Sequence, residues 1–97
     1  MGSLRGRRPV ARARLFAEAV GLPPPPSAIV PLILGDAGSA LEASEGLAEA
    51  GFLVVAIRPP TVPAGTARLR FSFSAHHTED DVRALVRAVE HLGLAPQ

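Results

Sequence analysis

Apolar residues recur at helical spacing in three stretches of the chain. The first stretch, 9–21, begins with a proline that suits the first turn of a helix. In the second, 39–50, leucine and alanine alternate with glutamate, and Gly51 suits a C-terminal cap. The third, 78–92, opens with the capping-box pattern of a threonine and an aspartate three residues later. The pattern predicts three amphipathic helices.

Three shorter stretches have the pattern of strands. Residues 29–34 and 52–57 are continuous apolar runs, as in buried strands. Residues 67–74 alternate, so that Arg68 and Arg70 lie on the face opposite the leucine and phenylalanines. Pro31 cannot donate a ladder hydrogen bond, which predicts an edge position or a bulge for the first strand.

The order of these elements, α-β-α-β-β-α, predicts an α+β fold in which a small three-stranded sheet has its helices on one face. A run of four prolines within 22–26 is typical of an extended linker. We therefore expect an N-terminal basic helix and proline linker over 1–26 and a compact domain over 27–97. The second face of the sheet would need a cover that the sequence does not show.

Composition narrows the class of protein. Ninety-seven residues, 47% hydrophobic and 20% charged, suit one small globular domain. The absence of cysteine excludes disulfides and cysteine-based metal sites, and it favours a cytoplasmic protein. No apolar stretch approaches the roughly 18–20 residues that span a membrane.

The charge is uneven along the chain. Residues 1–14 hold five arginines and no acid, whereas the remainder holds five arginines and nine acids. Such a start is compatible with contact to nucleic acid or a membrane surface, or with a transit peptide. Aromatic residues that stack on bases are nearly absent there. We expect the solvated face of a first helix, with no nucleic-acid or membrane partner.

The histidines predict no metal site. His76 and His77 are adjacent, so in extended chain they point to opposite faces, and no cysteine or suitably spaced carboxylate joins them or His91. His77 is expected to lead into the last helix rather than to catalyse, and His76 receives no role. Asp80 and Asp81 are explained by the helix dipole, which favours negative charge in a first turn.

Residues 57–70 read IRPPTVPAGTARLR. Prolines hold such a loop in shape, and the guanidinium forks of Arg58, Arg68 and Arg70 suit carboxylate or phosphate. With the IVPLILGD of residues 29–36, this run makes the stretch 28–92 resemble the C-terminal small domain of the α-oxoamine synthases. These are pyridoxal-phosphate-dependent acyltransferases of the fold-type I aminotransferase class.

The resemblance implies an enzyme that condenses an amino acid with an acyl thioester, releases carbon dioxide and works as a homodimer. Arg70 would bind the amino-acid carboxylate and Arg58 a second carboxylate, while Arg68 would form a surface or interdomain ion pair. The Ile-Arg-Pro-Pro of residues 57–60 is typical of the biotin-pathway member, which implies L-alanine and a pimeloyl thioester as substrates. The alternatives are a glycine C-acetyltransferase or 5-aminolevulinate synthase type, or a non-catalytic α+β binding module.

The chain contains no lysine, because all ten Lys+Arg residues are arginine. Pyridoxal phosphate in this family needs a lysine, which the resemblance assigns to a large domain that this chain lacks. We therefore assign it no catalytic or cofactor-binding residue and expect it to be inactive alone. It is predicted to be a fragment, a truncated gene product or one half of a split enzyme.

Overall fold

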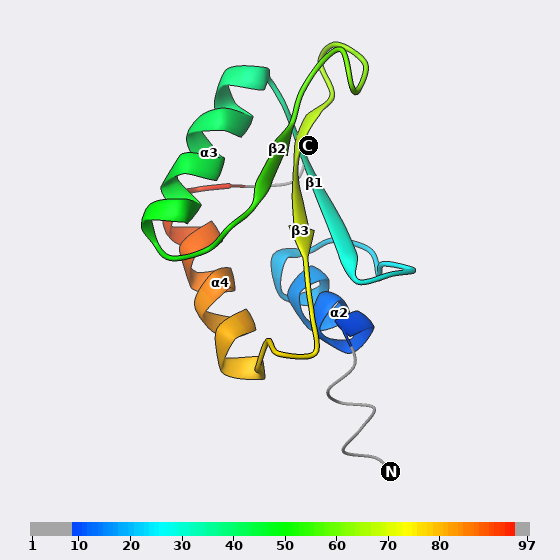
Figure 1. Cartoon of the computed structure of the whole chain (residues 1–97), viewed down its shortest axis with the longest axis vertical. Coiled ribbons are helices and arrows are strands. Elements are labelled where there is room, and N and C mark those ends of the chain that lie inside the picture. Colours follow the sequence, from blue (N-terminus) through cyan, green and yellow to red (C-terminus); the bar gives the residue numbers. More distant parts are fainter. Residues whose placement is uncertain (1–8, 95–97) are drawn as a thin grey trace.

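The computed structural model describes residues 9–94, which form three helices and one three-stranded sheet. The elements are α2 (Pro9–Val20), β1 (Ile29–Gly35), α3 (Ala37–Glu49), β2 (Val55–Ile57), β3 (Ala67–Ser72) and α4 (Glu79–His91). This order confirms the predicted α-β-α-β-β-α arrangement. In Figure 1, α3 and α4 follow one side of the sheet, and α2 lies near one end of β1 and β3. Within the described part, no helix has the length and hydropathy of a membrane span.

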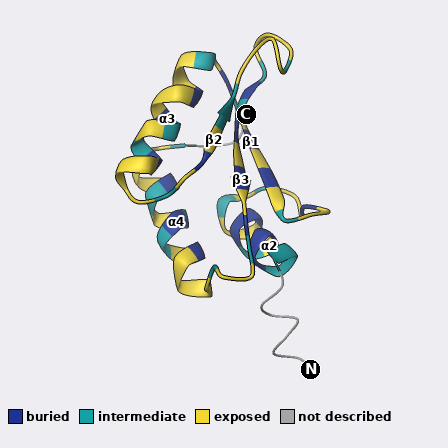
Figure 2. Cartoon of the chain, viewed as in Figure 1, coloured by how far each residue is buried: buried dark blue, intermediate teal, exposed yellow. Residues whose placement is uncertain are grey.

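The sheet has the order β1-β3-β2, and both pairs are antiparallel. β3 is therefore the central strand, and β1 lies at an edge, as Pro31 predicted. On one face Val30 pairs with Phe71 and Leu32 pairs with Leu69, and all four are buried. The helices cover this face, which confirms the predicted one-sided packing (Figure 2).

The other face of the sheet is called the open face below. Its residues alternate along the three strands with those that face the helices: Ile29, Pro31, Ile33, Val55, Ile57, Arg68, Arg70 and Ser72.

The hydrophobic core joins all three helices to the sheet. Phe16 of α2 is completely buried, and its ring centroid lies 4.6 Å from that of Phe71 and 5.4 Å from that of Phe73. Helix α2, which precedes the proline run, thus packs in the same core as the elements after it. The sequence predicted a division into 1–26 and 27–97, but α2 of the first part shares one hydrophobic core with the second part.

Strand β2 is shorter than the predicted 52–57, and the prediction was wrong for 52–54. The backbone of this segment is engaged by α3 instead of the sheet. The Phe52 N–H donates to the Leu47 carbonyl at 2.8 Å, and the Ser44 hydroxyl donates to the Val54 carbonyl at 2.7 Å. Gly51 supplies the positive φ, +97°, that this helix ending requires.

Strand β3 ends at Ser72 rather than at the predicted residue 74. The Ser74 N–H turns away from the sheet and donates to Nδ1 of His77 at 2.9 Å. The capping box that follows is confirmed: Asp81 N–H donates to the Thr78 hydroxyl at 3.0 Å, and Thr78 N–H donates to the Asp81 carboxylate at 2.9 Å. Six residues, 73–78, thus connect the end of β3 to the capped start of α4.

Candidate functional site

Arg70 lies in the middle of the central strand, on the open face. Its backbone is paired on both sides, with Pro31 of β1 and with Val55 of β2. The residue is exposed, and the ion pairs among residues 9–94 involve only the guanidinium groups of Arg12 and Arg83. The sheet therefore fixes the backbone of Arg70 and leaves its guanidinium available for a carboxylate.

Arg68 lies two residues before Arg70 on the same face, between Ile33 and Ile57. It is half-buried, and its Nε donates to the Thr66 carbonyl at 3.1 Å. The ion pair expected for Arg68 does not form with any carboxylate of the described part.

Arg58 directly follows β2 and is exposed. Its carbonyl accepts the Thr61 N–H at 3.1 Å, so the proline loop turns immediately after it. Arg58 lies three residues beyond Val55, the partner of Arg70, which corresponds to about 10 Å along a strand. The fold thus places Arg68 and Arg70 on one face of the sheet and Arg58 directly after the end of the neighbouring strand β2.

The open face combines these cations with exposed apolar side chains. Ile29, Ile33 and Val55 are 43%, 37% and 50% exposed, and none of the residues on this face is acidic. A crevice of about 340 Å³ between the proline run and β1 borders it. Such a surface suits a carboxylate-bearing ligand or contact with another protein surface.

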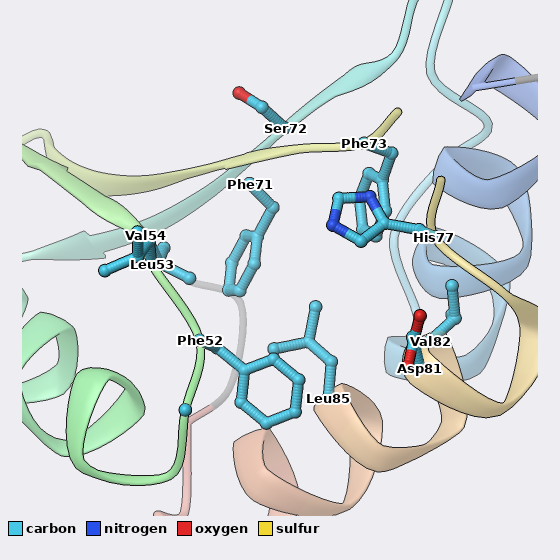
Figure 3. Close-up of a pocket in the computed structure, with 11 residues that line it drawn as sticks. Phe52, Leu53, Val54, Phe71, Ser72, Phe73, His77, Asp81, Val82 and Leu85 are labelled. Atoms are coloured by element: carbon cyan, nitrogen blue, oxygen red, sulfur yellow. The ribbon is translucent and has the colours of Figure 1, made fainter. Parts of the chain in front are cut away.

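A larger cavity of about 500 Å³ lies on the helix side of the sheet, and sequence reasoning missed it. It is formed by the segment 51–54, the end of β3 and the beginning of α4 (Figure 3). Arg58, Arg68 and Arg70 are not among its lining residues. The residue in the sequence that could have indicated this cavity is His77, which lies between a predicted strand and a predicted capped helix.

Helix α2 reaches this region through Arg12. The Arg12 side chain is buried, its Nε donates to the His77 carbonyl at 2.8 Å, and its Nη1 lies 3.9 Å from the Glu79 carboxylate. The prediction of a solvated basic face was therefore wrong for Arg12, because α2 packs this side against α4. It was right for Arg14, which is exposed.

The other arginines of the basic start, Arg5, Arg7 and Arg8, lie outside the described residues. His77 directly precedes the cap of α4, which confirms its expected place at the start of the helix. Within residues 9–94, no three histidine or carboxylate side chains gather as metal ligands would.

Comparisons with known proteins agree with this fold. The profile of the family described as aminotransferase class I and II matches residues 2–89. An 8-amino-7-oxononanoate synthase of Methylobacterium nodulans is 57% identical over 91 residues, which are 94% of this chain and 24% of that protein. The chain spans about a quarter of the length of the curated relatives it matches.

Two solved structures are similar in fold and sequence. A Sphingomonas wittichii serine palmitoyltransferase matches with a TM-score of 0.76 at 30% identity, over 91% of this chain and 25% of that chain. A variant serine palmitoyltransferase from S. paucimobilis, with a bound PLP–myriocin aldimine, matches with a TM-score of 0.68 at 29% identity, over 92% and 25%. Since the family profile covers nearly the whole sequence, the chain belongs to the aminotransferase class I and II family.

Proposed function

We propose that this chain is the C-terminal small domain of an 8-amino-7-oxononanoate synthase of the biotin pathway. Such an enzyme condenses L-alanine with a pimeloyl thioester and releases carbon dioxide and the free thiol. Three bacterial relatives with that name support the proposal, because they are 56–59% identical to this chain over 85–91 residues. The Ile-Arg-Pro-Pro of residues 57–60 favours the same member of the family.

The observation that carries the proposal is the setting of Arg70. Strand pairing on both sides holds its backbone, while its exposed guanidinium has no carboxylate partner in the described part. A guanidinium binds a carboxylate through two parallel hydrogen bonds, which fixes the orientation of the amino acid as well as its position. Arg58, about 10 Å further along, is proposed to bind a second carboxylate, that of the acyl chain or the product.

The residues of this chain do not fit a complete pyridoxal-phosphate site. The family's cofactor is bound through a lysine, and the sequence contains none. We propose that the rest of a full-length protein, of the relatives' length, supplies the lysine and the other cofactor contacts. The chain by itself is then inactive, and its contribution is substrate recognition.

The open face is proposed to lie against that remaining part. Its exposed isoleucines and valine would be buried by such contact, and Arg68 would meet a carboxylate there. We further propose that 27–97 forms the body of the small domain and that α2, from the 1–26 segment, packs into its core. A cytoplasmic homodimer is proposed for the complete enzyme.

The proposal is tested with the full-length protein that contains this chain, loaded with pyridoxal phosphate. Release of free thiol from pimeloyl thioester is measured with L-alanine, glycine and L-serine. We expect the highest kcat/KM with L-alanine. A preference for glycine or serine would assign the chain to another α-oxoamine synthase, and no thiol release with any of the three would favour a non-catalytic binding module.

A further inference from the structure

The cavity on the helix side of the sheet has the properties of a binding site of its own. Its volume, about 500 Å³, falls within the roughly 300–1,000 Å³ of pockets that hold small molecules. Three phenylalanine rings line it, together with aliphatic side chains from two elements, and the 95% exposed Leu53 lies at its margin. The lining residues with apolar side chains are Phe52, Leu53, Val54, Phe71, Phe73, Val82 and Leu85.

His77 supplies the polar group of this cavity. Figure 3 shows its ring projecting from the turn after β3 towards the centre of the cavity. Because Nδ1 accepts the Ser74 N–H at 2.9 Å, the neutral ring carries its proton on Nε2. The Nε2–H of His77 is therefore available as a hydrogen-bond donor to a molecule in the cavity.

Further contacts hold this histidine in place. Arg12 donates to its carbonyl at 2.8 Å, and the Phe73 ring meets the imidazole edge-on at a centroid distance of 5.9 Å. A donor that is fixed by its neighbours loses little freedom when it binds an acceptor, which favours a binding role.

The charge of the cavity selects against anions. Asp81 is the one charged side chain among its lining residues, and the Ser72 side chain points away from it (Figure 3). The Asp81 carboxylate accepts the Thr78 N–H, which lowers its pKa and keeps it ionised at neutral pH. The cavity therefore has a negatively charged lining residue, whereas the open face carries the positive charges of Arg68 and Arg70.

We propose that this cavity binds an uncharged molecule with an aromatic or branched apolar body and one hydrogen-bond acceptor, such as an amide or ketone carbonyl, which receives the Nε2–H of His77. The site goes beyond the proposed enzymatic function, because it uses neither Arg70 nor the substrate carboxylates.

The test uses the complete 97-residue chain, labelled with ¹⁵N, and nuclear magnetic resonance titrations with two matched probes. N-methylbenzamide has an aromatic body and a neutral carbonyl, and benzoate has the same body with a negative charge. We expect the amide to shift the resonances of the cavity residues and of His77 Nε2. Both probes can accept the Nε2–H, but the negative charge of benzoate is repelled by Asp81, so we expect benzoate to bind there at least about fivefold more weakly, a factor equivalent to about 1 kcal/mol. Equal binding of both probes, or no shifts at the cavity up to the solubility limit of the amide, would overturn the proposal.

Variants separate the donor from its surroundings. His77→Phe keeps a ring and removes the N–H, so it should weaken amide binding about fivefold. His76→Phe, at an exposed neighbour that does not line the cavity, should leave it unchanged. The tautomer of His77 in the unsubstituted chain is an independent check, and a proton on Nδ1 would contradict the site. Arg70→Ala should not alter amide binding, so this proposal and the enzymatic one can fail separately.

Discussion

The structure makes Phe16 the residue that binds helix α2 to the rest of the fold. Its side chain is completely buried, and its ring contacts those of Phe71 and Phe73. Replacing a buried phenylalanine by alanine typically destabilises a protein by about 3–5 kcal/mol. Phe16→Leu fills more of the space but loses both ring contacts, which contribute about 0.5–1.5 kcal/mol each, so we expect a loss of about 1–3 kcal/mol.

The loss for Phe16→Ala is a large part of the roughly 5–15 kcal/mol that stabilises a native protein. It is measured by urea denaturation followed by far-ultraviolet circular dichroism, because the chain has no tryptophan or tyrosine for fluorescence. Arg14→Ala, at an exposed site of the same helix, is the control and should change stability by less than about 0.5 kcal/mol. Equal effects of Phe16→Ala and Arg14→Ala would refute the inclusion of α2 in the core.

Two further predictions concern the contacts around the start of α4. Arg12→Ala removes the donor to the His77 carbonyl and should lower the free energy of unfolding by about 1–3 kcal/mol. Arg12→Lys, which lacks Nε–H, should recover only part of this loss. Full recovery in Arg12→Lys would contradict the role of that hydrogen bond. Thr78→Ala should cost about 1 kcal/mol through the lost cap. The pKa of Asp81 lies below its ordinary 3.8, because its carboxylate accepts the Thr78 N–H. The stabilisation that the ionised carboxylate contributes is fully present above pH 3.8 and is lost as the pH falls through the lowered pKa. Asp81→Asn should therefore flatten the acid side of a plot of urea midpoint against pH.

Local patterns in the sequence predicted most of the fold. The alternation of 67–74 placed Arg68 and Arg70 on one face, and Pro31 indicated an edge strand. Both predictions succeeded because each depends only on residues within a single strand. The apolar run 52–57 misled, since Phe52 and Val54 have strand-forming side chains while their backbone bonds to α3. These partners lie on the preceding helix, five and ten residues away, and such backbone hydrogen bonds leave no trace in the periodicity of the side chains.

The candidate sites divide in the same way. Arg70 was found from a contiguous motif, and its strand fixed its face. The cavity was missed because its walls come from a loop, a strand and a helix that are distant in sequence and meet only in the fold. Arg12 was assigned to solvent because nothing local to α2 shows that α4 will pack over it.

The most direct test of the central claim is the dependence of catalysis on Arg70 in the full-length, cofactor-loaded protein. For Arg70→Ala we predict a loss of at least about thirtyfold in kcat/KM for L-alanine, chiefly through KM, because a charged hydrogen-bonding pair contributes about 2 kcal/mol or more. The KM for the acyl thioester should change by less than about twofold. Arg87→Ala, at an exposed position of α4, serves as the control and should match the unsubstituted enzyme. An unchanged KM for L-alanine in Arg70→Ala would remove Arg70 from the substrate site and contradict the account.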